Sequence, residues 1–272
     1  VHVLSIKRYV IAKEYWSCVA PSNYLVNLCS VTLSTMAVSN SVRILFHSVA
    51  AAMFWYAIQY EYNYVKIPVD QHPMARAIGG KFKYLTFLNA ICQAVYYTIA
   101  LVNDFIGSNK VSQKGLPLIR KLRDYIMVSL AFPMATNVST TFWTLMAIDR
   151  ELVFPKFLDD FVPVWLNHIM HTMILVCIVL ELFVSFRKYP TRRNGMLGLI
   201  IFMTGYLIWI HIIRHYSGAW VYPILDVLPF VMRVVFFVVV IGLTALFYIL
   251  GEHLNGSIWA KELKQLKSSK NK

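Results

Sequence analysis

Charged side chains are scarce in this sequence, and acids are scarcer than bases. Only 14% of the 272 residues are charged, whereas a soluble domain carries about 25% charged residues. Hydrophobic residues make up 58% of the chain, and no stretch between the apolar runs is long enough to bury a core of its own. The composition excludes an ordinary soluble enzyme and indicates a single multipass membrane domain.

Cysteine is also rare, and its spacing excludes two further classes. The four cysteines, Cys18, Cys29, Cys92 and Cys177, show no paired spacing, which argues against a disulfide framework and a zinc ribbon. The formal charge of +13 would suit nucleic acid, but Lys and Arg are scattered between apolar runs and form no basic face. We therefore expect the bilayer, and no nucleic acid, as the main partner.

Six apolar runs are each close to the roughly 20 residues that a helix needs to cross about 30 Å of hydrocarbon. The predicted spans cover residues 44–60, 84–106, 125–148, 164–186, 196–213 and 231–250. Residues 17–38 also lack charge, but polar residues dilute them, so we assign them to an extension. The predicted fold is all-α: a polytopic bundle of about six transmembrane helices (42–252), after a cytosolic N-terminal extension (1–41) and before a basic cytosolic tail (253–272).

The distribution of basic residues predicts the orientation. Eighteen of the 26 Lys and Arg residues lie in the N-terminal segment, the second and fourth loops and the tail. Cytoplasmic segments carry this excess, so both termini are expected in the cytosol, with the first, third and fifth loops on the opposite side. Aromatic residues near the span ends are interpreted as interfacial anchors: Tyr60, Tyr62, Tyr64, Tyr84, Trp165, Trp220 and Tyr222.

The fourth span begins with two histidines that point to chemistry. His168 and His171 share one helix face, and ionisable groups inside a membrane are a functional-site hypothesis by default. Thr86, two residues into the second span, enters from the same side and is expected in the same leaflet as His171. A hydroxyl becomes a nucleophile when a base takes its proton, so Thr86 and His171 form a candidate pair.

These residues also have other interpretations. A membrane threonine commonly bonds to a carbonyl one turn earlier, and interfacial histidines commonly bond to backbone or water. His168 and His171 could also join His211 and His215 in a four-imidazole metal site, although no carboxylate completes a familiar metal motif. The sequence therefore leaves a base and a set of metal ligands as alternatives.

Other polar residues are assigned to supporting roles. Glu181 is too deep in the fourth span to orient His171, whereas the loop acids Asp159, Asp160 and Asp226 lie on the suitable side. The third span carries a run of polar residues, and we expect their main role to be hydrogen bonding between helices. That run comprises Thr136, Asn137, Ser139, Thr140, Thr141 and Thr144.

Several motifs, in order, resemble one known family. They are KYLTFLN after Gly-Gly, LAFP, FWTLMAIDRELVFPK, WLNHIMHT, SGAWVYP and LGEHLNGSIW. Together they cover about residues 42 to 260 and resemble the androgen-induced-gene-1 family, which includes the androgen-dependent regulator of tissue factor pathway inhibitor. Residues 1–41 have no counterpart that these motifs place.

The resemblance implies a fold and a reaction. Members of that family are multipass membrane hydrolases that cleave fatty acid esters of hydroxy fatty acids with a threonine and a histidine. By motif, these residues are Thr86 and His171. Asn89, His168 and His215 are candidate supporting residues, and Asn89 or His168 is the candidate oxyanion donor. The implied partner is a lipid with a fatty acyl ester bond, no cofactor is implied, and the expected location is the endoplasmic reticulum or the plasma membrane.

Two other functional classes fit the same sequence. The chain could be a membrane interaction or signalling protein whose buried polar groups serve only helix packing. It could instead be a lipid enzyme with a histidine-liganded metal. Covalent labelling by a serine-hydrolase probe, with and without Thr86, separates the hydrolase from the first class, and metal analysis tests the second.

The predicted orientation has a direct test. The sequon Asn255-Gly256-Ser257 follows the sixth span and should lie in the cytosol, without a glycan. In sealed microsomes the tail should be open to added protease, and glycosidase treatment should leave the mass of the chain unchanged. A glycan on Asn255, or a protected tail, would mean that the spans were miscounted.

Overall fold

The structure is a computed structural model that describes residues 38–68, 73–111 and 115–270. Almost all of the predicted N-terminal extension, including residues 17–37, lies outside the described residues. The described chain consists of helices and connecting loops and contains no strand. The predicted all-α fold is confirmed for this part of the protein.

Each predicted span corresponds to a long helical stretch. The stretches are α3 (Asn40–Asn63), α5 (Leu85–Ile106), α6 (Leu118–Ile126) with η2 (Met127–Ala131) and α7 (Phe132–Ile148), α8 (Val164–His168) with η5 (Ile169–Met173) and α9 (Ile174–Val184), α10 (Arg192–Ser217), and α12 (Phe230–Ile258). The short elements are α4 (Pro73–Arg76), η1 (Gly80–Lys83), η3 (Arg150–Leu152), η4 (Lys156–Asp160), α11 (Pro223–Val227) and α13 (Ala260–Lys270). The residues predicted as a basic tail therefore continue as helix.

Five of the six stretches in the described chain are long and apolar enough to cross a membrane. The exception contains the third predicted span and runs without a break through α6, η2 and α7. Between Met127 and Ser139 every residue except Leu130 is buried. A helix enclosed by other helices does not contact lipid, so it tolerates a more polar sequence than its neighbours.

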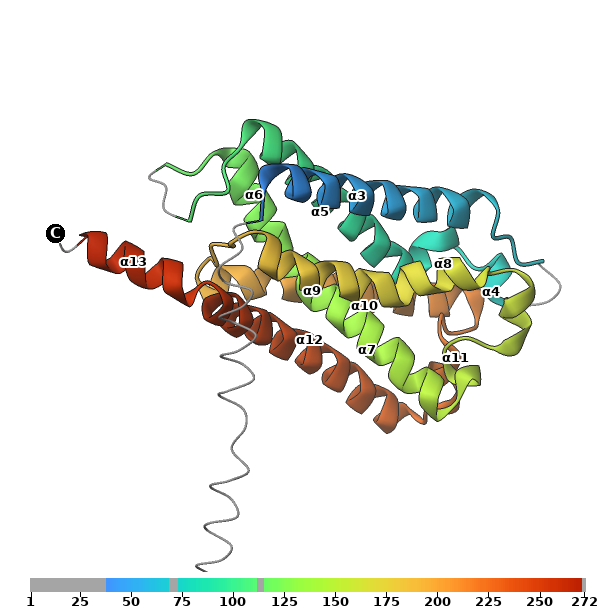
Figure 1. Cartoon of the computed structure of the whole chain (residues 1–272). Helices are drawn as coiled ribbons and strands as arrows, with labels where there is room; N and C mark the ends of the chain where they lie inside the picture. Colours follow the sequence, from blue (N-terminus) through green and yellow to red (C-terminus); the bar gives the residue numbers. More distant parts are fainter. Residues whose placement is uncertain (1–37, 69–72, 112–114, 271–272) are drawn as a thin grey trace, which may run out of the picture.

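The ends of the bundle separate the loops into two groups. In Figure 1, α4, α11 and the beginning of α8 lie at one end, whereas α6 and α13 lie at the other. The first, third and fifth loops therefore meet at one end of the bundle, as the predicted topology requires. The functional candidates of these loops are brought together there.

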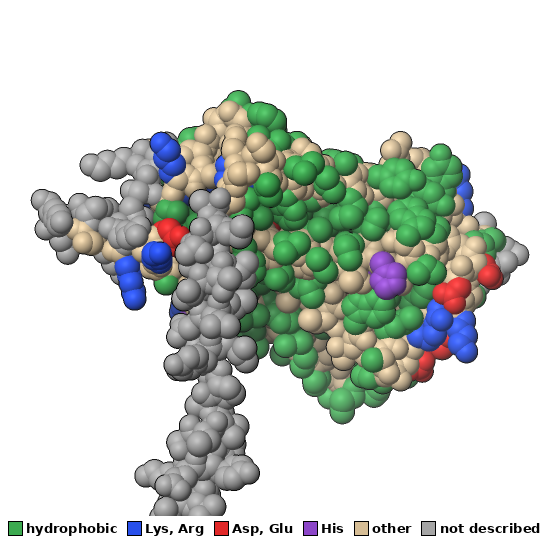
Figure 2. Space-filling view, in the orientation of Figure 1, with side chains coloured by type: hydrophobic (Ala, Val, Ile, Leu, Met, Phe, Trp, Pro, Cys, Tyr) green, Lys and Arg blue, Asp and Glu red, His purple; other side chains and the backbone are tan. Residues whose placement is uncertain are grey.

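The outer surface is apolar over the middle of the bundle. Figure 2 shows hydrophobic side chains across the centre of one face, with charged side chains near its two ends. On α12 alone, Phe230, Val231, Val235, Val238 and Leu246 are each at least half exposed. Soluble monomers rarely expose so large an apolar area, whereas a bilayer requires one.

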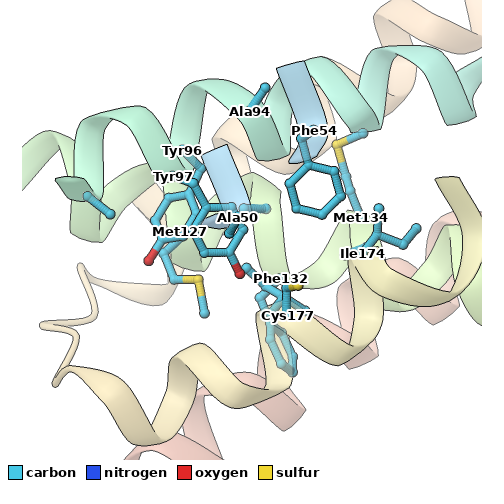
Figure 3. Packing of buried hydrophobic residues seen from close by; sticks show 14 of the residues in the cluster. Ala50, Phe54, Ala94, Tyr96, Tyr97, Met127, Phe132, Met134, Ile174 and Cys177 are labelled. Atoms are coloured by element: carbon cyan, nitrogen blue, oxygen red, sulfur yellow. The ribbon is translucent and has the colours of Figure 1, made fainter. Parts of the chain in front are cut away.

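The core is built where α3, α5, the continuous stretch of α6, η2 and α7, and α9 meet (Figure 3). Small side chains such as Ala50 on α3 and Ala94 on α5 let these helices approach closely. The rings of Phe54 and Tyr97 stack with their centroids 5.8 Å apart. This packing fixes the position of α5, whose first turn carries Thr86.

Buried charges connect the same helices toward the opposite end. The ring of His47 on α3 lies 2.6 Å from an Asp104 carboxylate oxygen and 3.0 Å from one of Glu181. Glu181 also accepts a 2.9 Å hydrogen bond from Tyr96 and is paired with Arg187, and all of its side chain is buried. In hydrocarbon such groups persist only when paired, so this network joins α3, α5, α9 and the fourth loop.

The interpretation of the polar residues in the third span changes with the structure. The hydroxyls of Thr136 and Thr140 donate to carbonyls of Phe132 and Thr136, one turn earlier in their own helix. The interpretation of the third span as mainly interhelical hydrogen bonds was therefore wrong for these two threonines. A threonine back-bond satisfies the hydroxyl locally, and no partner helix is needed.

The side chain of Asn255 is buried and hydrogen-bonded within the bundle. Its side-chain amide donates to the Arg187 carbonyl at 3.0 Å and accepts from the Arg187 amide at 3.2 Å, and the residue is 4% exposed. Burial alone would block a glycan on the folded chain. The protease accessibility of the tail is therefore the part of the topology test that decides the orientation.

The buried network predicts a large effect of one neutral substitution. Glu181→Gln removes the carboxylate paired with Arg187 and one of the two carboxylates that contact His47, and breaking a buried ion pair costs about 3–5 kcal/mol. We expect a strongly lowered melting temperature in detergent. The matched control is Glu252→Gln, because Glu252 pairs with Arg192 in a pair whose side chains are 27% and 60% exposed, and such pairs contribute at most about 1 kcal/mol. Equal shifts for the two variants would contradict a structural role for the network.

Candidate active site

Gly79 and the short helix η1 set the position of Thr86. Gly79 has a φ of +88°, which favours glycine, and a Cβ there would lie 2.7 Å from the ring of Trp209. The chain then turns through η1, and Lys83 is anchored by a hydrogen bond of 2.5 Å from its ammonium to the Met74 carbonyl. Thr86 is consequently the second residue of α5.

Two tyrosines cap the beginning of α5. The N-cap residue, Tyr84, offers no side-chain hydrogen bond to the helix. Instead the Leu85 amide lies 3.0 Å from the Tyr206 hydroxyl oxygen and 2.8 Å from that of Tyr222. Helix termini leave amides unsatisfied, so this contact replaces an ordinary cap and holds the first turn against α10 and the fifth loop.

His171 lies in the π-helical turn η5. Its Nδ1 is 3.0 Å from the carbonyl oxygen of Asn167, and its ring stacks on Phe142 with a centroid distance of 3.5 Å. Because a carbonyl can only accept, Nδ1 carries the hydrogen and Nε2 presents a lone pair. Single π-helical turns are frequent at functional sites, and here one carries the candidate base.

The structure brings Thr86 and His171 together. The Thr86 hydroxyl oxygen lies 3.3 Å from Nε2 of His171, although the two residues are 85 positions apart in the sequence. The hydroxyl can therefore donate to the nitrogen that has the free lone pair. This distance falls within the range that a nucleophile and its general base need before substrate binds.

The pair opens into an apolar pocket formed by all three loops at this end. Its walls include the side chains of Phe87, Phe142, Phe154, Phe157, Leu158 and Met170. Lys81 and Glu61, whose side chains are paired at 2.8 Å, contribute the charged groups of the lining. A smaller pocket between α5, α7 and α12 shares Thr86, Phe142, Val153 and Tyr222 with the first, so both pockets border Thr86.

The candidate supporting residues lie elsewhere. Asn89 is fully buried on α5, where its side-chain oxygen accepts from Gln93 at 3.2 Å, and it lines neither pocket. His168 is exposed, stacks on Trp143 and lies 3.1 Å from the Thr172 hydroxyl. His215 is on α10, outside both pockets. None of the three shows a hydrogen bond to Thr86 or His171 in the part of the chain that the structure describes.

The structure also bears on the hypothesis of a four-histidine metal site and on that of a loop acid that orients His171. The described residues contain no group of three or more His, Cys, Asp or Glu side chains placed to hold a metal ion, so the four histidines do not form one site. His211 instead lies 2.7 Å from the Leu207 carbonyl of its own helix. Asp159 pairs with Arg150, and the partner that orients His171 is the backbone carbonyl of Asn167.

Tyr222 is the pocket residue that the sequence interpretation missed, whereas Tyr206 caps α5 from outside both pockets. Tyr222, with Tyr84 and Trp220, was interpreted as an interfacial anchor, but Trp220 is only 6% exposed and Tyr222 lines both pockets. The SGAWVYP motif contains Tyr222 and was the available signal. Tandem aromatic residues after a span are typical of interfaces, and only the fold shows that this loop turns inward.

Comparison with known proteins gives consistent matches. Residues 29–256 match the model of the FAR-17a/AIG1-like protein family. The matched range includes the end of the predicted N-terminal extension. The chain is 36% identical to the human androgen-induced gene 1 protein over 77% of this chain and 89% of that protein. It is 37% identical to the mouse androgen-dependent TFPI-regulating protein, over 66% of this chain and 78% of that one. The human counterpart of the latter is 32% identical over 75% of this chain and 89% of its own length.

No solved structure matches the chain. The sequence relationship, in contrast, covers every motif that surrounds the pocket, from the turn before α5 to the fifth loop. The chain is therefore an integral, multipass membrane protein that belongs to the FAR-17a/AIG1-like family.

Proposed function

We propose that this protein is an integral-membrane lipid ester hydrolase that cleaves fatty acid esters of hydroxy fatty acids. The observation that carries the proposal is the 3.3 Å contact between the Thr86 hydroxyl and Nε2 of His171 inside an apolar pocket. A hydroxyl and an imidazole with a free lone pair form the minimal unit of nucleophilic acyl transfer.

The proposed reaction proceeds in two stages. Nε2 of His171 takes the hydroxyl proton while the Thr86 oxygen bonds to the ester carbonyl carbon. The bond to the alcohol oxygen then breaks, and that oxygen takes the proton from His171 and leaves as the hydroxy fatty acid. Water then attacks the acyl-threonine with His171 again as base, which releases the fatty acid and restores both side chains.

The shape of the site supports a substrate with two chains. The ester bond would lie at Thr86, where the two pockets meet, and each pocket would receive the chain on one side of that bond. The second pocket is lined by Val138, Leu145, Phe236 and Val240, all of which suit a hydrocarbon chain. A compact water-soluble ester would leave most of this apolar surface uncovered.

Substitution of the pair tests the nucleophile and the base. Thr86→Ala and His171→Ala should each lower turnover of a fatty acid ester of a hydroxystearic acid at least about 100-fold. Since the two act as a unit, the double variant should be little worse than either single variant. Thr86→Ser should retain activity because it keeps the hydroxyl. Turnover by purified protein in detergent, with covalent labelling of Thr86 by a fluorophosphonate, measures these effects.

Matched controls lie on the same helices. Thr98→Ala removes a hydroxyl of α5 that bonds to the Ala94 carbonyl, and His168→Ala removes an exposed imidazole one turn from His171. Both variants should keep nearly full turnover. Undiminished activity of a folded Thr86→Ala protein would overturn the proposed nucleophile, and failure of the wild-type protein to hydrolyse any ester or to be labelled would favour the interaction or signalling class.

Removal of metal ions separates a base from a metal ligand. If His171 acts as a base, incubation with a strong chelator should leave turnover unchanged, and His211→Ala should have a much smaller effect than His171→Ala. Turnover is measured before and after chelation and dialysis. Loss of activity that one added metal restores would support the metal enzyme instead.

A further inference from the structure

The hydroxyl of Tyr222 occupies a position that the proposed pair leaves unexplained. Tyr222 follows α10, and its ring enters the site from the fifth loop and lines both pockets. Its oxygen lies 2.8 Å from the Leu85 amide and 3.1 Å from the Tyr206 oxygen, and the residue after Leu85 is Thr86. A phenol is therefore held beside the candidate nucleophile.

The hydroxyl hydrogen of Tyr222 is not used by the helix cap. The Tyr206 hydroxyl lies 3.0 Å from the Lys83 carbonyl, which can only accept, so that bond uses the single hydrogen of Tyr206. The Leu85 amide donates to the two tyrosine oxygens. The hydrogen of Tyr222 consequently remains for Thr86, for the Tyr206 oxygen or for a group that enters the pocket.

We propose that the Tyr222 hydroxyl is the oxyanion donor of this site, a role that rests on the proposed ester hydrolysis. When the Thr86 oxygen bonds to the carbonyl carbon, the electron pair of the C=O bond moves to its oxygen. That oxygen accepts a hydrogen bond from Tyr222, with no transfer of the proton. When the tetrahedral intermediate collapses, the pair returns, the C=O bond re-forms and the bond to the leaving oxygen breaks.

Three features suit Tyr222 to this role. Burial raises the pKa of the Tyr222 phenol above its ordinary value, so the oxygen keeps its hydrogen at neutral pH. The hydrogen bond from the Leu85 amide polarises the phenol, which strengthens it as a donor. Thr86 also lies in the first turn of α5, where the helix dipole favours negative charge.

The other polar side chains near the pair are placed less well. Asn89 and His168 lie outside both pockets, and Nδ1–H of His171 is used by the Asn167 carbonyl. Asn167 lines the larger pocket from the helix of His171 but shows no hydrogen bond to Thr86 among the described contacts. Tyr222 is the described side chain that combines a donor, a place in the lining of both pockets and a hydrogen bond to the residue next to the nucleophile.

The test is Tyr222→Phe, which keeps the ring and removes only the hydroxyl. With a fatty acid ester of a hydroxystearic acid, kcat of the purified protein should fall about 100-fold while KM changes less than about threefold, because the donor acts on the transition state. The rate of fluorophosphonate labelling of Thr86 should fall by a similar factor, because the phosphoryl oxygen also requires the donor.

Tyr206→Phe is the matched control. It removes the other hydroxyl of the same helix cap, and Tyr206 lines neither pocket. Its melting temperature should fall at least as much as that of Tyr222→Phe, but its kcat should change less than about threefold. Equal losses of kcat in the two variants, or an unchanged kcat in Tyr222→Phe, would assign Tyr222 to helix capping and overturn the proposal.

A second variant covers the case in which Tyr222→Phe does not fold. Incorporation of 3-fluorotyrosine at position 222 keeps the shape of the side chain and makes the phenol more acidic, so kcat should rise about twofold at neutral pH. An unchanged kcat would overturn the donor assignment alone. A wild-type chain that shows neither ester turnover nor Thr86 labelling would overturn the hydrolase and the donor together.

Discussion

In a bilayer, every polar group that leaves water needs a partner within the protein, and this constraint organises the whole chain. It explains the two polar centres of the bundle. Near one end each of His47, Asp104, Glu181 and Arg187 has an oppositely charged partner among the other three. Near the other end Thr86 and His171 satisfy each other in the resting state, yet they remain beside a pocket that another group can enter.

The amino-acid sequence was sufficient to predict the helices and the candidate pair, because both depend on patterns that are local or set by depth. Span lengths follow the thickness of the hydrocarbon, and the distribution of Lys and Arg fixes which loops share a side. Thr86 and His171 then fall at similar depth on helices that enter together. The distance of 3.3 Å between them agrees with that argument, although their chemical roles remain proposals.

The missed features depend on contacts between distant segments. Nothing near Glu181 in the sequence indicates that His47, 134 positions away, is its partner. The inward turn of Tyr222 depends on the Leu85 amide, and the π-helical turn around His171 has no glycine or proline to announce it. The enclosure of the third span likewise depends on the helices around it, and the sequence analysis did not single this span out.

The position of the two polar centres along α5 has a consequence for where this protein acts. Thr86 and Asp104 lie on the first and last turns of that helix, and a rise of 1.5 Å per residue separates them by roughly 27 Å, close to the depth of the hydrocarbon. The charged network therefore occupies one leaflet and the pocket the other. The proposed hydrolase would therefore be sided: it would draw lipid from a single monolayer, and a molecule in the opposite monolayer would first have to flip across the membrane.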